Sequence, residues 1–265
     1  MLIVLNIGFF IWQLTFSDSS ESDQVAQAGI QGVSERDQNS IEFGAIPYRL
    51  LHPGRDCGIG ETSPGEADVV CEGTDEYDRA AADPHFVALD DAPWFLTIFT
   101  SMFMHGGILH IAFNMLFLWI FGNNVEDAMG RGRFLLFYLL AGLAAVYSQA
   151  ALDPSSTVPT IGASGAIAGV LGAYALLLPR ARVLTLIFII FFVTLVEIPA
   201  YVMLGIWFVL QFLPAVGQVA TPDVAGGGGV AYFAHVGGFA FGLALVRLFA
   251  TRRPGIPGGP APTAY

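Results

Sequence analysis

A serine and a histidine stand out because each lies in an otherwise apolar stretch. Ser164 lies in Gly162-Ala163-Ser164-Gly165, where a polar connection gives way to a helix-forming run. His235 lies in a second apolar run, directly after Ala234. Polar side chains are costly inside membrane spans, and a hydroxyl beside an imidazole base is the minimum for an activated nucleophile. We predict Ser164 as nucleophile and His235 as general base.

Each residue also has a plainer interpretation, because a lone serine in a membrane helix usually packs or caps and a lone histidine can simply be hydrogen-bonded. Matching small-residue faces favour a joint site. Gly165 is the first small residue on one face of the helix that follows Ser164, and Gly238 and Gly242 form a matching face on the helix that carries His235. Helices with such faces pack with their backbones close together, so we expect Ser164 and His235 at similar depth.

His110 and Asn114 are four residues apart and therefore share one face of a helix. Their side chains, together with the Ser164 N–H, are candidates to bind the oxyanion of a tetrahedral intermediate. Interhelical hydrogen bonding is the alternative. A metal site built from His105, His110 and His235 is disfavoured, because no His-Glu-x-x-His motif occurs and no carboxylate accompanies them in the spans. We expect no metal.

The composition indicates a membrane protein. Hydrophobic residues make up 54% of the 265 residues and charged residues only 12%, against about 25% charged in a typical soluble domain. The apolar residues form long runs, which predicts spans in a lipid bilayer. The chain has no lysine and no basic patch, which argues against nucleic-acid binding.

We divide the chain into four parts. Residues 1–16 are a first span, about 22 Å long against a hydrocarbon core of about 30 Å, whose start we expect to be clipped or to lie upstream. Residues 17–93 are an acidic external loop with most of the 22 acidic residues. Residues 94–250 are the core, opening with an interfacial helix, and residues 251–265 are a disordered cytoplasmic tail. Further spans are expected at 107–123, 134–152, 161–178, 199–216 and 232–250.

Two segments leave alternatives open. The apolar run 183–196 is too short to span alone, so it is either the start of a long tilted span or a membrane-embedded connection. Cys57 and Cys71 both lie in the acidic loop, where they form a disulfide if the loop faces an oxidising compartment, or remain free thiols. The arginines flanking the spans place both termini in the cytoplasm and the acidic loop outside.

The motifs from His105 to Asn114, from Gly162 to Gly165 and from Ala234 to Gly242 occur in this order between about Trp94 and Phe249. Together they resemble the rhomboid family of intramembrane serine proteases. The resemblance implies an all-α membrane protein, a six-transmembrane-helix bundle with a long extramembrane loop between spans one and two. It also implies hydrolysis, without a cofactor, of peptide bonds in or near transmembrane segments of single-span or polytopic membrane proteins. We expect a prokaryotic plasma membrane, with the site opening outward.

The resemblance also implies roles for single residues. Ser164 and His235 would form a dyad without a third acidic member, with His110, Asn114 and the Ser164 N–H as the oxyanion hole. Supporting roles are implied for His105, which would close the interfacial loop, for Glu126, which would help to hold that loop, and for the glycines Gly162, Gly165, Gly238 and Gly242.

The sequence departs from the family pattern at two places. Leu96-Thr97 replaces a Trp-Arg pair of the interfacial loop, and Ala168 replaces a tyrosine that in some members stacks on the catalytic histidine. The runner-up function is a catalytically silent rhomboid-like protein that binds membrane clients. A transporter or channel would call for buried charges along a pathway, and the spans offer only Glu197 near a boundary.

Overall fold

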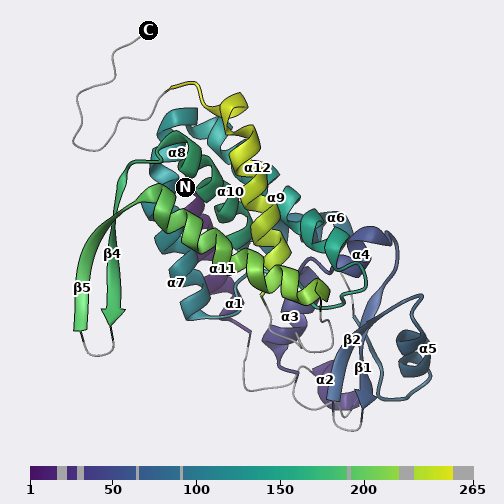
Figure 1. The fold of residues 1–265 in the computed structure, drawn as a ribbon. Helices are drawn as coiled ribbons and strands as arrows, with labels where there is room; N and C mark the ends of the chain where they lie inside the picture. The colour runs from purple at the N-terminus through teal and green to yellow at the C-terminus, as the bar shows by residue number, and fades with distance from the viewer. Residues whose placement is uncertain are drawn as a thin grey trace. The chain divides into compact units, whose positions relative to one another are not determined.

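The computed structural model describes residues 1–16, 23–28, 33–63, 66–89, 92–189, 192–220 and 230–252. The chain divides into two compact units. Figure 1 labels its helices and strands. Unit 1 comprises residues 1–115 and 146–164, and unit 2 comprises residues 116–145 and 165–265. The helices α7, α9 and α10 each contribute residues to both units.

Helices dominate the described residues. In chain order the helices are α1 (Leu2–Gln13), α2 (Asp23–Ala28), α3 (Glu35–Phe43), α4 (Pro47–Leu51), α5 (Asp75–Ala81), α6 (Trp94–Thr100), α7 (Ile108–Phe117), α8 (Asn123–Met129), α9 (Arg131–Leu152), α10 (Ser164–Leu177), α11 (Ala200–Ala220) and α12 (Tyr232–Phe249). A 3₁₀ turn follows α6 at Ser101–Phe103, and a π-helical turn joins α7 to α8 at Leu118–Gly122. The strands are β1 (Cys57–Ser63), β2 (Glu66–Cys71), β3 (Val87–Ala88), β4 (Arg182–Ile189) and β5 (Phe192–Pro199).

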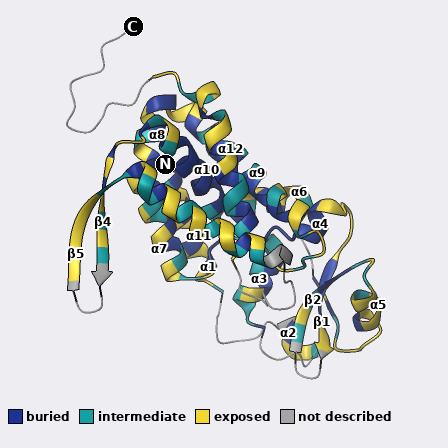
Figure 2. Cartoon of the chain, in the orientation of Figure 1, coloured by how far each residue is buried: buried dark blue, intermediate teal, exposed yellow. Residues whose placement is uncertain are grey.

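Four helical stretches of the described residues are long and apolar enough to cross a membrane. They are Ile108–Met129, Arg131–Leu152, Ala200–Gly217 and Tyr232–Phe249. The remaining two expected spans, at 2–16 and 161–178, correspond to the shorter apolar helices α1 and α10. Figure 2 shows that α10 is mostly buried, whereas α11 exposes much of its length. A short buried helix together with longer helices that expose apolar side chains is consistent with a helical bundle in a lipid bilayer.

The described residues of the apolar run 183–196 form two paired strands, so its interpretation as the start of a long tilted span is wrong. Its interpretation as a membrane-embedded connection stays a prediction. Strands β4 and β5 pair antiparallel, with Arg182 opposite Pro199 and Ile189 opposite Phe192. Arg182 Nη1 lies 3.0 Å from Glu197 Oε2 near the open end of the hairpin. The run is rich in β-branched and aromatic residues, which favour strands, and a short apolar run does not itself distinguish helix from strand.

The insertion 17–93, expected as an acidic external loop, contains helices and strands where it is described. Ser34 and Asp37 form a capping box at the start of α3. Strands β1, β2 and β3 form an antiparallel sheet in the order β2-β1-β3. A small core that includes Ile46, Ile59 and Val87 lies beneath it. The all-α prediction is therefore wrong for this insertion as well as for the hairpin.

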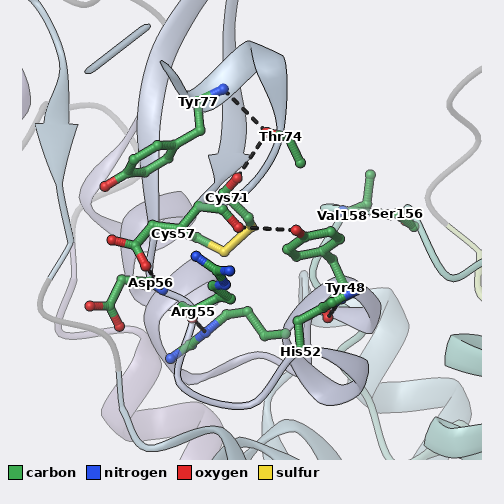
Figure 3. The surroundings of a disulfide bond; sticks show 12 residues. Tyr48, His52, Arg55, Asp56, Cys57, Cys71, Thr74, Tyr77, Ser156 and Val158 are labelled. Carbon is green, nitrogen blue, oxygen red and sulfur yellow. Dashed lines mark hydrogen bonds between the residues drawn. A yellow bond between two sulfur atoms is a disulfide. The ribbon is translucent and has the colours of Figure 1, made fainter. Parts of the chain in front are cut away.

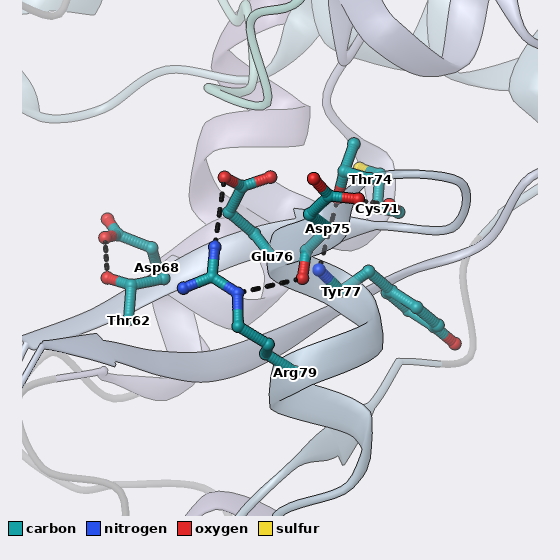
Figure 4. Close-up of polar contacts among 8 residues, drawn as sticks. All are labelled: Thr62, Asp68, Cys71, Thr74, Asp75, Glu76, Tyr77 and Arg79. Carbon is teal, nitrogen blue, oxygen red and sulfur yellow. Dashed lines mark hydrogen bonds and ion pairs between the residues drawn. The ribbon is translucent and has the colours of Figure 1, made fainter.

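Cys57 and Cys71 form a disulfide that joins the start of β1 to the end of β2 (Figure 3). Beside it, the Tyr48 hydroxyl donates to the carbonyl of Glu72 at 3.0 Å. After the disulfide, Thr74 caps α5 by accepting a hydrogen bond from the Tyr77 N–H at 3.2 Å (Figure 4). The cross-link thus lies within a hydrogen-bonded fold, and not in a structureless loop.

Within unit 1, the insertion is bonded to the connection that precedes α10. Ala45 and Thr160 exchange two backbone hydrogen bonds, of 3.1 and 2.9 Å. The Tyr48 N–H donates to the Ser156 carbonyl at 3.0 Å. The insertion therefore fixes the backbone that leads into Ser164.

Within unit 2, α10 and α12 approach closely through their glycines. A Cβ atom on Gly238 would meet the carbonyl oxygen of Gly165, and one on Gly242 would meet the carbonyl oxygen of Gly169. A Cβ on Gly172 would meet the Phe239 carbonyl in the same way. Only residues without a side chain allow two helix backbones to come this near.

The expected C-terminal tail is described only at its start. The N–H groups of Thr251 and Arg252 both donate to the carbonyl of Ala128 in unit 2, at 2.8 and 3.1 Å. Residues 253–265, on which the rest of that prediction falls, lie outside the described residues.

We expect Gly242→Ala to destabilise the protein by about 1–3 kcal/mol, since the added methyl group meets a backbone carbonyl that cannot move independently of α10. Gly205→Ala is the matched control, because Gly205 lies inside α11 with nothing within 4 Å of an added Cβ. The control should be neutral or slightly stabilising. Thermal unfolding in detergent micelles measures both variants, and equal melting temperatures would contradict the close packing.

Candidate active site

Within unit 1, the side chains of His110 and Ser164 both lie close to Gly162. Its backbone has a φ of +122°, in a region that side chains rarely adopt. A Cβ there would lie 2.8 Å from Nε2 of His110 and 3.6 Å from Oγ of Ser164. The structure therefore brings the candidate nucleophile and one candidate oxyanion donor to either side of one glycine.

The protonation of His110 follows from its backbone partner. The Gly106 N–H donates to Nδ1 of His110 at 3.3 Å. An accepting Nδ1 carries no proton, so the neutral ring carries its proton on Nε2. That nitrogen is the one that lies beside Gly162. His110 thus presents an N–H donor next to the backbone of the Ser164 motif, as a developing oxyanion would require.

Asn114 lies one turn along α7 from His110 and is buried. Its Nδ2 donates to the carbonyl of His110 at 3.0 Å, which is a contact within its own helix. The amide has a second hydrogen for another acceptor. The shared face of His110 and Asn114 is observed, and the role of Asn114 in an oxyanion hole stays a prediction.

His105 is fully buried at the end of the connection before α7. Its backbone N–H donates to Oε1 of Gln13 in α1 at 2.8 Å, and its Nδ1 donates to the Phe103 carbonyl at 3.1 Å. Its ring centroid lies 5.2 Å from that of His110, edge to face. His105 therefore anchors its loop, with α1 supplying the partner. Gln13 was missed from sequence, although a glutamine in an apolar helix is itself a signal.

The same connection is bonded to the glycine of the serine motif. The Gly162 N–H donates to the carbonyl of Ser101 at 2.8 Å. Ser101 is buried, and its hydroxyl donates to the Ile98 carbonyl at 3.1 Å. The 3₁₀ turn after α6 thus helps to fix the unusual backbone at Gly162.

The insertion supports α6 where Leu96-Thr97 departs from the family pattern. The buried Arg49 donates from Nη2 to the Ala92 carbonyl at 3.2 Å, just before the helix starts. At its other end, the Thr100 hydroxyl donates to the Phe43 carbonyl at 2.6 Å. Backbone acceptors and an arginine from the insertion therefore hold this helix in place.

In unit 2, His235 is held by α11. Its Nδ1 lies 2.8 Å from Oε1 of Gln211, and its ring centroid lies 6.1 Å from that of Trp207. Ala168, which replaces the expected stacking tyrosine, is buried in α10. Trp207 is thus an aromatic neighbour that comes from another helix. Sequence reasoning missed Gln211, although its polar side chain interrupts a long apolar span.

The close approach of α10 and α12 brings Gly165 and Ala234 near each other within unit 2. A Cβ on Gly165 would lie 3.8 Å from the Cβ of Ala234. These residues are the sequence neighbours of Ser164 and His235. Ser164 itself belongs to unit 1 and His235 to unit 2, so their pairing as a dyad stays a prediction.

Glu126 lies in α8 of unit 2, with its Oε1 3.8 Å from Nε of Arg131. Its implied role in holding the interfacial loop therefore stays a prediction. For metals, no group of three or more His, Cys, Asp or Glu side chains comes together within the described ranges.

We expect Gly162→Ala to destabilise the protein by about 1–3 kcal/mol from backbone strain alone, with a further cost because the new methyl group overlaps the His110 ring. Gly107→Ala is the control, since an added Cβ there has nothing within 4 Å. Thermal unfolding of both variants provides the measurement. A Gly162→Ala protein as stable as Gly107→Ala would show that the backbone at 162 is not constrained as described.

The stability of the fold should fall in mild acid because of His105. Burial, and secondly the nearby His110, lowers the pKa of His105 from 6.5 to about 4. The fold therefore favours the neutral ring, and this contribution is complete above pH 6.5 and is lost as the pH falls from 6.5 towards 4. His105→Gln should flatten that part of the melting-temperature curve, whereas His52→Gln, at an exposed histidine of the insertion, controls for loss of a histidine elsewhere. An unchanged slope in His105→Gln would contradict this assignment.

The family model and three relatives that match this chain are all named as rhomboid. The sequence model of the Rhomboid domain matches residues 93–252. Rhomboid protease GluP of Bacillus subtilis is 47% identical over 76 residues, which are 29% of this chain and 14% of that protein. Rhomboid protein 1, mitochondrial, of Saccharomyces cerevisiae is 30% identical over 152 residues, 56% of this chain and 40% of that protein. Inactive rhomboid protein 1 of Drosophila melanogaster is 30% identical over 93 residues, 35% of this chain and 6% of that protein.

The chain therefore matches less than half the length of each of these relatives, and they include one protein named as a protease and one named as inactive. They come from a bacterium, from mitochondria and from an animal, so they do not single out the bacterial plasma membrane that the sequence analysis expected. The domain match covers more than half of this chain and contains both the long apolar helices and the serine and histidine motifs. The chain belongs to the rhomboid family and is an integral membrane protein.

Proposed function

We propose that this protein is an intramembrane serine endopeptidase. Its substrates would be membrane proteins, single-span or polytopic, cut at peptide bonds in or near their transmembrane segments. Ser164 is the nucleophile and His235 the general base. His110, Asn114 and the backbone N–H of Ser164 form the oxyanion hole. The reaction needs no cofactor, because the nucleophile, the base and the donors are all side-chain or backbone groups of this chain.

The reaction follows the two steps of acyl transfer. Oγ of Ser164 attacks the scissile carbonyl while Nε2 of His235 takes the hydroxyl proton, and the same proton then goes to the leaving amine as the C–N bond breaks. Water, deprotonated by His235, next attacks the acyl-enzyme, and the proton returns to Oγ as the ester bond breaks. The negative charge that develops on the carbonyl oxygen in each step is the charge that an oxyanion hole stabilises.

The observation that carries this proposal is the arrangement of His110 around Gly162. The ring is held from one side by the Gly106 N–H, and its protonated nitrogen lies beside the glycine that also neighbours Oγ of Ser164. A protein that only packs its helices has no need of an N–H donor beside the glycine that neighbours a serine hydroxyl. This arrangement is what an acyl-transfer site needs, and it supports catalysis more than it supports packing.

The site is proposed to open to the side of the membrane that carries the disulfide. Cys57 and Cys71 are cross-linked, which is typical of an oxidising compartment. The insertion that contains them is bonded, within unit 1, to the connection before Ser164. The arginine distribution places the chain termini on the opposite, cytoplasmic side.

The second candidate function is a catalytically silent membrane-client binder, which the similarity to Inactive rhomboid protein 1 favours. It differs in its demands on the site, because a binder requires neither a nucleophile nor a base. Retention of Ser164, His235, His110 and Asn114 in this chain therefore favours the protease.

We expect the purified protein to cleave a transmembrane model substrate in micelles or vesicles, and Ser164→Ala and His235→Ala to lose this activity while keeping the wild-type melting temperature. His110→Ala should lower kcat by roughly 10²–10³-fold, the usual cost of one oxyanion donor. Labelling of Ser164 by a fluorophosphonate probe gives an independent measurement. His52→Ala, in the insertion, serves as the active control.

Two results would reject the proposal. Cleavage that persists in Ser164→Ala would exclude this serine as the nucleophile. A folded wild-type protein that neither cleaves any of a panel of transmembrane substrates nor reacts with the probe, but still binds them, would favour the silent client binder.

A further inference from the structure

We propose that Gln211 is a positioning residue for the candidate base His235, fixing both the direction of the imidazole and the nitrogen that carries its proton. The inference rests on the proposed function and adds a third member to what the family resemblance implies is a two-residue dyad. It is argued entirely within unit 2, where α11 and α12 pack against each other.

The contact lies on a regular helix interface. Trp207 and Gln211 are four residues apart on α11, and His235 and Phe239 are four residues apart on α12, so each pair shares one helix face. The centroid of Trp207 lies 5.9 Å from that of Phe239 and 6.1 Å from that of His235. Gln211 continues this face by one turn. Its side chain therefore reaches His235 from a packed helix, and not from a mobile loop.

The hydrogen bond decides the tautomer of the base. Oε1 of Gln211 lies 2.8 Å from Nδ1 of His235. An amide oxygen only accepts, so Nδ1 must be the donor and carries the proton. In a neutral imidazole Nε2 is then the unprotonated nitrogen with the lone pair, which is the form needed to take a proton from a serine hydroxyl. The opposite tautomer would present an N–H where the base must accept.

A neutral partner for this histidine also suits its surroundings. The helices α9, α10, α11 and α12 contain no aspartate or glutamate. Their other ionisable side chains are Arg131, Arg133, Tyr138, Tyr147, Tyr174, Tyr201, Tyr232 and Arg247. A carboxylate inside an apolar bundle is expensive, whereas an amide orients the ring without bringing a charge into the membrane. In a catalytic triad the acidic residue both orients the histidine and brings a negative charge. Gln211 would orient His235 without bringing a charge.

The test compares two substitutions at Gln211, of which one removes the strong hydrogen-bond acceptor and the other keeps one. Gln211→Met keeps the length and removes the strong acceptor, and we expect kcat to fall roughly 10- to 100-fold with KM unchanged, since only the proton transfer is affected. Gln211→Glu keeps an acceptor and should restore most of the activity.

The matched control is Leu210→Met, which introduces the same residue at the adjacent, largely exposed position of α11. It should retain wild-type kcat and the wild-type pH profile. A Gln211→Met protein with kcat within about twofold of Leu210→Met would overturn the proposal, because base catalysis that depends on orientation cannot lose its orienting bond without cost.

A second measurement does not depend on activity. Nitrogen-15 NMR of histidine-labelled protein in micelles, with the His235 signal identified by its loss in His235→Ala, reports which ring nitrogen carries the proton. We expect Nδ1–H in the wild type and a shift towards Nε2–H in Gln211→Met. Nε2–H in the wild type would overturn the proposal. If the tautomer shift is seen but the wild type cleaves nothing, the Gln211–His235 pairing stands and the proposed protease function fails.

Discussion

The close approach of α10 and α12 is the constraint on which the second unit depends. Gly238 and Gly242 lie so near the carbonyls of Gly165 and Gly169 that neither can carry a side chain without displacing a backbone. The close packing fixes the rotation and the depth of both helices. His235, one turn before Gly238, is therefore held at a defined place on its helix, where α11 meets it with Trp207 and Gln211. The glycines set the backbone, and the polar and aromatic contacts then orient one side chain.

The two histidines of the candidate site have opposite protonation patterns, each set by a different partner. The backbone N–H of Gly106 leaves His110 with its proton on Nε2, whereas the amide oxygen of Gln211 leaves His235 with its proton on Nδ1. One ring is thereby prepared to donate and the other to accept. Neither arrangement needs a charged group, which suits a site surrounded by apolar helices.

Sequence patterns predicted this protein well where one physical effect dominated. Long apolar runs revealed the four membrane-length helices. Polar residues within apolar stretches singled out Ser164, His110 and His235 as candidates, and their roles stay predictions. The hairpin at 182–199 was missed because apolar content alone does not distinguish strands from helices. The strands of the insertion were not predicted, because local composition does not encode the pairing of β1 with β2 and β3. Gln211 was recognisable as polar, but its partner depends on how α11 and α12 pack.

The hydrogen bonds between the insertion and the connection before α10 mean that the folding unit of this protein extends beyond the domain that it shares with its relatives. The region that relatives share starts at residue 93, yet Gln13, Ala45 and Tyr48 all hold backbone inside it through bonds within unit 1. Shared ancestry and cooperative folding thus have different boundaries in this chain. A gene fragment cut to the shared region would encode every candidate catalytic residue and still lack the partners that hold the serine loop in shape.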